Sequence, residues 1–376
     1  MKIPFNRASI PRTDIDLLLD AIESGHISGN GRYTKLSEEI LSSRLGVERT
    51  LLTTSCTSAL EMSALLLRLS KDDEVIMPSF TFVSTANAFA LFGARPVFVD
   101  SENATLNIDA DLIERAITKK TRAICVVHYG GVACEMDKIL DIAKTHNLKV
   151  IEDNAHGLFG KYRGRFLGTI GSLATQSFHE TKNISCGEGG ALLINESEFV
   201  ERAEILREKG TDRTKFFRGQ IDKYTWVDIG SSWVMSDMLS AILYGQLSRS
   251  DDIQIRRMKI WSRYKSELQG WSEQYGVQLP VVPEYCEHTG HLFHMRFRTV
   301  DQRNRFIDLL RTEEITATFH YQPLHLSKVG KLFSSPNDRL PIAENAGDCL
   351  VRLPLYDSLS ESEQMRVIEV TKSFHP

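Results

Sequence analysis

The sequence predicts an α/β protein whose larger part is a mostly parallel β-sheet lying between helices. Short apolar runs alternate with amphipathic helical patterns between about residues 50 and 195. The runs are apolar almost throughout, as strands buried on both faces should be. From about residue 275 onward, strand-like and helix-like segments are mixed, which favours a smaller α+β domain at the C-terminal end.

The strands of the large domain are predicted from β-branched residues and the turn residues that bound them. Between the strands, residues 57–69 and 136–146 repeat apolar side chains at helical spacing, with Leu60, Ala64 and Leu67 on one stripe of the first segment. This alternation of strand and helix predicts helices on both faces of a parallel sheet. The six predicted strands span residues 74–77, 96–100, 123–128, 149–153, 174–178 and 191–194.

The C-terminal third is predicted to be a separate domain. A long helical pattern over residues 236–268 carries the chain out of the large domain. A strand at 291–297 and helices at 304–314 and 361–373 follow it. We therefore expect a large domain over residues 1–245, which includes an N-terminal arm, and a small domain over residues 246–376.

Composition excludes several classes of protein. The chain of 376 residues is 42% hydrophobic and 25% charged, which is ordinary for a globular enzyme. Its 45 basic and 49 acidic residues leave a net charge of −4, so neither nucleic acid nor an anionic membrane is an expected partner. No apolar stretch approaches the roughly 18 residues of a membrane helix. The six cysteines form no C-x-x-C pair, so a reduced, cytoplasmic protein is expected.

Reactive side chains follow several of the predicted strands. Asp153 ends one strand, and Lys182 lies shortly after another. A run of hydroxyl residues, 53–58, precedes a predicted helix, and such a helix start can bind phosphate. Because ligands of parallel sheets bind beyond the carboxyl ends of the strands, these groups are expected to meet.

Together, an aspartate, a lysine and a hydroxyl-rich helix start are the parts that a pyridoxal phosphate site needs. A lysine can bind the aldehyde covalently, and a carboxylate can keep the ring nitrogen protonated. Each part also has a plainer interpretation: Asp153 as a helix cap, Lys182 as a solvated surface residue, and Ser55 to Ser58 as an ordinary N-cap. A Gly-rich turn at 187–190 could be only a tight connection.

Other motifs are absent or weak. The chain has no G-x-x-x-x-G-K-[ST] motif and no convincing G-x-G-x-x-G motif, which argues against nucleotide-loop folds. His288, His291 and His294 are evenly spaced, but they lie at a strand entry, where residues three apart should not converge on one metal. No metal site is expected.

At these residues the sequence resembles the DegT/DnrJ/EryC1/StrS family of sugar-nucleotide aminotransferases over nearly its whole length. The resemblance implies the fold-type-I architecture of aspartate aminotransferase, with a seven-stranded sheet, and pyridoxal or pyridoxamine phosphate as cofactor. The chain most resembles the branch that makes dTDP-4-amino-4,6-dideoxygalactose for the enterobacterial common antigen. The matching stretches are 52–62, 74–88, 177–183, 207–211, 216–220 and 222–226.

The resemblance also implies roles for the cofactor-binding residues. Lys182 would be the Schiff-base lysine and proton shuttle, and Asp153 would pair with the pyridine nitrogen. Phe82 would stack on the cofactor ring. His156 stands where relatives often have Gln, near the ring hydroxyl, and its protonation state is left open. The phosphate would be bound by Thr57, Ser58 and Ser177.

Further residues are implied to come from a second subunit or from the substrate side. Relatives place an Asn on the phosphate from the partner subunit, and here Ser232 stands in its place. The resemblance therefore implies a homodimer with active sites at the interface. His320, Tyr321 and His325 match the substrate-side loop of the family, although such residues can also serve only to pack the domains together.

The implied reaction is amino transfer from L-glutamate to dTDP-4-dehydro-6-deoxyglucose. The product would be dTDP-4-amino-4,6-dideoxygalactose, with 2-oxoglutarate released. Alternatives are the 4-amino-4,6-dideoxyglucose epimer, another nucleotide ketosugar, or a catalytically silent cofactor-binding regulator. A dehydratase branch of the family has His in place of the lysine, and Lys182 argues against it.

Overall fold

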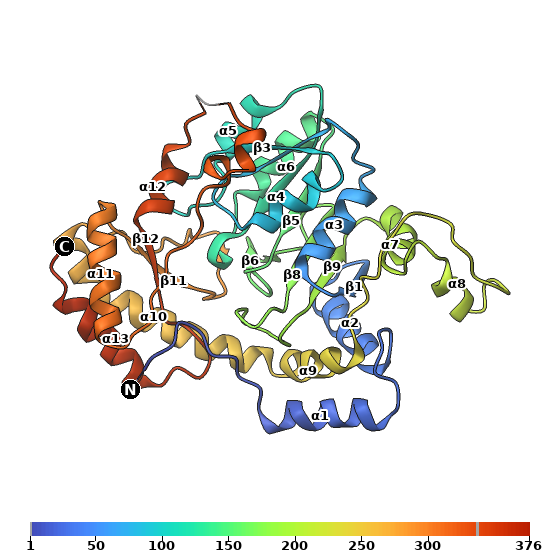
Figure 1. The fold of residues 1–376 in the computed structure, drawn as a ribbon, viewed down its shortest axis with the longest axis horizontal. Coiled ribbons are helices and arrows are strands. Elements are labelled where there is room, and N and C mark those ends of the chain that lie inside the picture. The colour runs from blue at the N-terminus through green and yellow to red at the C-terminus, as the bar shows by residue number, and fades with distance from the viewer. Residues whose placement is uncertain (1, 336–337) are drawn as a thin grey trace.

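A seven-stranded sheet forms the centre of the molecule (Figure 1). Its strands are β1 (Arg49–Thr53), β2 (Glu74–Pro78), β3 (Arg95–Val99), β4 (Thr121–Val127), β5 (Lys149–Asp153), β8 (Leu173–Ser177) and β9 (Gly190–Ile194). The computed structural model describes residues 2–335 and 338–376 and places them in the order β1-β9-β8-β5-β4-β2-β3. Only β9 opposes its neighbours in direction, so the predicted mostly parallel, seven-stranded sheet is confirmed.

The six strands predicted from sequence are present, each displaced by at most two residues at either end. The seventh, β1, was not predicted as a strand, because its short run Arg-Thr-Leu-Leu-Thr merges with the hydroxyl residues that follow it. It pairs with β9 at the edge of the sheet. This pairing places the hydroxyl run beside the other strand ends.

Helices lie on both faces of the sheet, in agreement with the prediction. The helices are α1 (Arg12–Glu23), α2 (Arg32–Leu45), α3 (Cys56–Leu66), α4 (Val83–Ala90), α5 (Ala110–Ala116), α6 (Met136–Thr145), α7 (Val200–Arg207), α8 (Arg213–Phe217), α9 (Asp237–Ser248), α10 (Ser250–Tyr275), α11 (Val300–Thr312), α12 (Pro341–Cys349) and α13 (Glu361–Ser373). Alternate strand residues face opposite layers. On β5, Ile151 packs with residues of α3 and α4, whereas Val150 packs with residues of α5 and α6.

The single long helix predicted over 236–268 is two helices. α9 ends at Ser248 and α10 begins at Ser250, because Arg249 leaves the helical conformation. The Arg249 guanidinium lies 2.6 Å from the buried Asp14 carboxylate of α1. The break lets α9 pack on α1 and α2 while α10 continues into the C-terminal core (Figure 1).

A second hydrophobic core fills the C-terminal part of the chain. It is built from α10, α11, α13 and a two-stranded sheet of β11 (Phe293–Arg296) and β12 (Leu350–Leu353). Ile3 joins this core through a parallel bridge to Ile315, so the N-terminal arm crosses to the small domain. The domain boundary at residue 245 stays a prediction.

Smaller elements connect the two cores. β6 (Lys161–Tyr162) pairs with β7 (Arg165–Phe166) and with β10 (Cys286–Glu287). Because β10 follows α10 in the chain, this pairing joins a segment of the C-terminal third to the large domain. Single 3₁₀ turns occupy Tyr129–Gly131, Ser197–Phe199, Leu324–Leu326 and Gly330–Leu332. Within the described residues, no helix has the length and apolar character that crossing a membrane requires.

Candidate active site

The carboxyl ends of β1, β8, β5, β4 and β2 lie at one edge of the sheet, and the candidate residues gather there. Thr53, the last residue of β1, and Ser177, the last residue of β8, both pair with Gly190, the first residue of the antiparallel strand β9. The three residues therefore lie side by side at this edge. Asp153, at the end of β5, pairs with Thr175 on β8. Residues far apart in the sequence therefore meet at this edge, as expected for a parallel sheet.

The hydroxyl run forms the start of α3. The Ser55 hydroxyl accepts the backbone N–H of Ser58 at 3.0 Å and caps the helix. The Ser58 hydroxyl lies 2.8 Å from that of Thr54, and the Thr57 hydroxyl donates to Ser84 at 2.8 Å. The result is a group of hydroxyls at a helix N-terminus, where backbone N–H groups favour an anion.

Gly190 allows β9 to lie against this helix start. A Cβ atom at residue 190 would lie 2.3 Å from the backbone nitrogen of Cys56 and 2.3 Å from the carbonyl carbon of Ser55. Such a distance is far inside van der Waals contact, and both neighbouring atoms are backbone. The Gly-rich turn therefore has a packing role beyond a tight connection.

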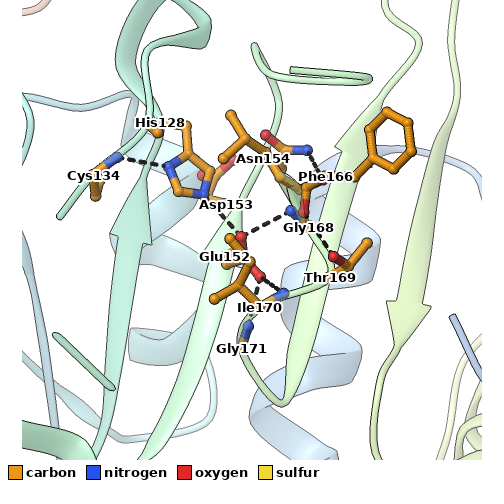
Figure 2. A network of polar contacts seen from close by, with 12 residues as sticks. His128, Cys134, Glu152, Asp153, Asn154, Phe166, Gly168, Thr169, Ile170 and Gly171 are labelled. Atoms are coloured by element: carbon orange, nitrogen blue, oxygen red, sulfur yellow. Dashed lines mark hydrogen bonds and ion pairs between the residues drawn. The ribbon is translucent and has the colours of Figure 1, made fainter. Parts of the chain in front are cut away.

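The two adjacent carboxylates at the end of β5 point to opposite faces of the sheet. Glu152 follows the direction of Val150, toward α5 and α6, and it is completely buried. Its oxygens accept the Nε2–H of His128 at 2.9 Å and the backbone N–H groups of Gly168, Ile170 and Gly171 at 2.6 to 2.8 Å (Figure 2). Glu152 thus serves the fold.

Asp153 follows Ile151 toward the other face, where α3 and α4 begin. Its Oδ2 accepts the Thr85 hydroxyl at 2.8 Å, and its Oδ1 lies 3.3 Å from the backbone N–H of Ala155. Burial raises the pKa of this carboxyl, while the Thr85 hydrogen bond and the Lys182 charge act in the opposite direction. A carboxylate in this setting can hold a neighbouring cationic ring nitrogen.

The Lys182 ammonium has no hydrogen-bond or ion-pair partner in the described part of the chain, although other lysines such as Lys149 are paired. Burial lowers the pKa of Lys182, and the nearby thiol of Cys56 and carboxylate of Asp153 oppose this shift. A lysine whose pKa is lowered by burial is not the solvated surface residue of the alternative interpretation. It is available to react.

His156 lies in a stack of rings beside the lysine. Its ring is stacked on His291 at 4.2 Å between centroids, and its Nδ1 accepts the backbone N–H of Gly130 at 3.3 Å. Burial, together with the charges of Lys182 and Arg352, lowers its pKa well below the usual value. The ring is therefore neutral with its proton on Nε2, which answers the question that the sequence left open.

Two of the predicted substrate residues also lie here. The His320 ring stacks on Tyr321 at 3.6 Å, and His320 Nδ1 lies 2.9 Å from the Tyr129 hydroxyl. Tyr321 has a φ of +31°, a strained backbone that functional sites often contain. Phe82, which is 56% exposed, lies 6.2 Å from the Tyr321 ring. These rings form one aromatic wall of the site.

The structure does not bring His325 and Ser232 into this group. His325 is buried with Nδ1 2.7 Å from the Ser79 hydroxyl and Nε2 3.4 Å from Glu344, which gives it a packing role. Ser232 is exposed and pairs with Glu208 in an isolated bridge.

Of the three histidines considered for a metal, His288 instead packs on Trp261. Among the described residues there is no group suited to hold a metal ion.

Several residues of the site were not predicted from sequence. Thr85 and Cys56 lie against Asp153, and Tyr129 and His291 belong to the ring stack. Arg352 of β12 is paired in register with His294, which lies 5.7 Å from the Tyr129 ring. Directly opposed residues share a face of a sheet, so Arg352 is on the site's side. Of these residues, only Cys56 and Tyr129 could have been singled out from the sequence, because each lies close to a strand end.

Known proteins match this chain over almost its full length. The profile of the DegT/DnrJ/EryC1/StrS aminotransferase family matches residues 9–372. The spore coat polysaccharide biosynthesis protein SpsC of Bacillus subtilis (strain 168) is 32% identical over 98% of this chain and 96% of its own length. GDP-perosamine synthase of Escherichia coli O157:H7 is 31% identical over 99% of this chain and 98% of its own.

A solved structure extends the likeness to three dimensions. Spr1654 from Streptococcus pneumoniae, in its PLP-form, has a TM-score of 0.91 with this chain at 28% identity. The match covers 99% of this chain and 97% of that chain. The agreement includes both cores described above.

Proposed function

Because this chain belongs to the DegT/DnrJ/EryC1/StrS aminotransferase family, we propose that it transfers an amino group from L-glutamate to dTDP-4-dehydro-6-deoxyglucose. It is a sugar aminotransferase that depends on pyridoxal phosphate. We propose dTDP-4-amino-4,6-dideoxygalactose as the product. The observation that carries the amino-transfer part of the proposal is Lys182, an unpaired lysine beside a buried and hydrogen-bonded Asp153.

The residues of the site fit the cofactor. The start of α3 offers hydroxyls and N–H groups suited to a phosphate, supplied by Thr57 and Ser58, with Ser177 on the strand in register with β1. Asp153 has the charge and burial suited to a pyridine nitrogen. The exposed Phe82 ring can cover the face of a flat ring system.

Bound pyridoxal phosphate supplies an aldehyde that carries the amino group and a ring that accepts electrons from the α-carbon of the donor. The Lys182 amine, whose pKa burial lowers, can remove the proton from that α-carbon and later return one to the sugar's C4. The Nε2–H of His156 can donate to the ring hydroxyl. His320 and Tyr321 can position the sugar, while His325 holds the 320–325 loop in place through its hydrogen bond with Ser79.

The galacto product and the dTDP carrier are supported by the sequence likeness alone. Stretches 216–220 and 222–226, outside the cofactor residues, carry that likeness. The relatives include a protein named for GDP-perosamine, so other nucleotide sugars belong in the test. The face of C4 that is turned to Lys182 determines the amino epimer, and a few kcal/mol between two sugar poses is enough for near-complete selectivity.

The test is a panel of dTDP-, UDP- and GDP-linked 4-ketosugars with L-glutamate, followed by product identification. We expect turnover of dTDP-4-dehydro-6-deoxyglucose and a small H3–H4 proton coupling in the product, which indicates the axial amine of the galacto form. A large coupling would identify the gluco epimer. Preference for a UDP- or GDP-sugar would reject the dTDP assignment while leaving amino transfer intact.

We further propose that the active enzyme is a homodimer. The support is the exposed segment around Ser232, which the family likeness assigns to the partner's phosphate site. Exposed apolar residues of the preceding segment 213–229, including Phe217, Trp226 and Ile229, give this region a surface suited to contact a second copy.

A further inference from the structure

Two threonine hydroxyls form a chain that ends on the Asp153 carboxylate. The Thr85 hydroxyl donates to Asp153 Oδ2 at 2.8 Å, and the Thr81 hydroxyl lies 2.8 Å from that of Thr85. A threonine has one hydroxyl hydrogen, and Thr85 uses it on Asp153, so Thr81 donates to Thr85. Thr81 and Thr85 are 2% and 1% exposed, so bulk water does not compete for either bond.

The second carboxylate oxygen has weaker partners. Asp153 Oδ1 lies 3.3 Å from the Ala155 N–H and 4.0 Å from the Cys56 sulfur. The Cys56 thiol is closer to Thr175 Oγ1, at 3.3 Å, and burial raises the pKa of this thiol, so it stays neutral. Among the described residues, Thr85 is therefore the only hydroxyl that donates to Asp153.

The charges around Asp153 make this bond important. Burial raises the pKa of Asp153, and the opposing contributions are the Thr85 hydroxyl, the Ala155 N–H, Lys182 and His128. The proposed reaction changes the charge of Lys182, and His128 is already bonded to Glu152. The neutral groups facing Asp153 from other elements are Cys56, Cys125 and Tyr321. The Thr85 bond is thus a stabilising contact that does not depend on the state of Lys182.

We propose that Thr85 is a positioning residue that holds Asp153 ionised and correctly oriented for the ring nitrogen of the cofactor, with Thr81 orienting the Thr85 hydroxyl. This inference rests on the proposed function, because it assigns Asp153 to that nitrogen. A hydrogen bond to a charged group changes an equilibrium by roughly ten- to a hundredfold. Loss of the bond should therefore shift the shared proton from the ring nitrogen toward the Asp153 carboxylate by the same roughly ten- to hundredfold.

The test uses the holoenzyme reconstituted with pyridoxal phosphate labelled with nitrogen-15 in the ring, without any substrate. In the wild type we expect the ring nitrogen resonance in the protonated range across neutral pH. In Thr85→Val, which has nearly the same shape, we expect the resonance to move toward the unprotonated range at the same pH, because the more basic Asp153 carboxylate draws the shared proton from the ring nitrogen. Thr85→Ser should restore the wild-type behaviour, and Thr81→Val should give a smaller shift of the same sign.

The outcomes separate the inference from the proposed function. A Thr85→Val enzyme that binds cofactor with wild-type nitrogen protonation would overturn the role of Thr85. Loss of cofactor in Thr85→Val but not in Thr85→Ser would support a role for the hydroxyl, and loss in both would reject it. The proposed function fails on a different result, namely a wild-type enzyme that carries labelled cofactor but transfers no amino group to any ketosugar.

Discussion

Replacing each of the two adjacent carboxylates of β5 with its amide separates a residue that holds the fold from one that serves the cofactor. Glu152→Gln and Asp153→Asn are chemically matched changes at neighbouring positions on opposite faces of one strand. We expect Glu152→Gln to reduce stability and Asp153→Asn to reduce catalysis. The comparison therefore tests the register of β5 directly.

The size of the Glu152→Gln effect follows from its hydrogen bonds. Gln can accept the N–H groups of Ile170 and Gly171, which both bond Oε1. Its NH₂ group then faces two donors, the Gly168 N–H and the His128 Nε2–H, because His128 Nδ1 accepts the Cys134 N–H (Figure 2). Two unsatisfied buried donors, at about 1–3 kcal/mol each, predict a loss of about 2–6 kcal/mol.

The effect should depend on pH. The His128 and backbone hydrogen bonds lower the pKa of Glu152 against the opposing effect of burial. A carboxyl whose folded-state pKa is lowered contributes its full stability above the unfolded-state pKa, about 4.3. That contribution disappears as pH falls through the folded-state value. The difference between wild type and Glu152→Gln should accordingly be largest near pH 7 and shrink below about pH 4.

The assay is equilibrium urea unfolding near pH 7 and near pH 3, with the visible absorption of the bound cofactor recorded in parallel at pH 7. Asp153→Asn should unfold within about 1 kcal/mol of the wild type yet lose amino transfer by at least about a hundredfold, because a neutral amide does not hold the ring nitrogen's proton. An Asp153→Asn enzyme with normal turnover, together with an inactive but stable Glu152→Gln enzyme, would refute this reasoning.

Three other variants test the remaining assignments. Lys182→Ala should abolish the visible absorption of the lysine-bound cofactor and slow amino transfer by about a thousandfold or more without destabilising the fold, and near wild-type turnover would exclude Lys182 as the reacting amine. Gly190→Ala should weaken pyridoxal phosphate binding, measured by equilibrium dialysis, because its Cβ would meet the backbone at Ser55 and Cys56 within 2.3 Å; Gly270→Ala, where nothing lies within 4 Å, is the matched control. Mixing inactive Lys182→Ala and Ser232→Trp subunits should restore activity if Ser232 acts in trans in a homodimer, and a mixture that stays inactive, or a fully active monomer at micromolar concentration in the ultracentrifuge, would contradict the shared site.

Regular elements were predicted well where a local pattern is strong. The β-branched run 149–153 is a strand over those same residues, and the pattern at 361–373 is a helix with a complete capping box at Ser360 and Glu363. The break at Arg249 was not predicted, because the apolar pattern of 236–268 continues across it. At the break, Arg249 forms an ion pair with Asp14, more than two hundred residues earlier in the chain, a contact that no local pattern reveals.

The site was predicted in part for a similar reason. Asp153 and Lys182 follow strand ends, and strand ends of a parallel sheet share one edge, so their meeting follows from topology. Thr85 lies inside the first turn of α4, where a threonine is unremarkable in sequence. Arg352 reaches the site's side only through the pairing of β11 with β12. His325 matched a family position, yet its contacts are those of a packing residue.

By itself, the sequence determined six of the seven strands of the large sheet, the positions of Glu152, Asp153 and Lys182 at or beyond strand ends, and the family of the chain, because each depends on local patterns or on a few residues at fixed spacing. Only the tertiary structure decided that Asp153 rather than Glu152 faces Lys182, that His156 carries its proton on Nε2, and that Thr81 and Thr85 support the carboxylate. The physical reason is that the direction of a side chain depends on strand register, and its charge and hydrogen bonds depend on neighbours that folding brings from distant parts of the chain.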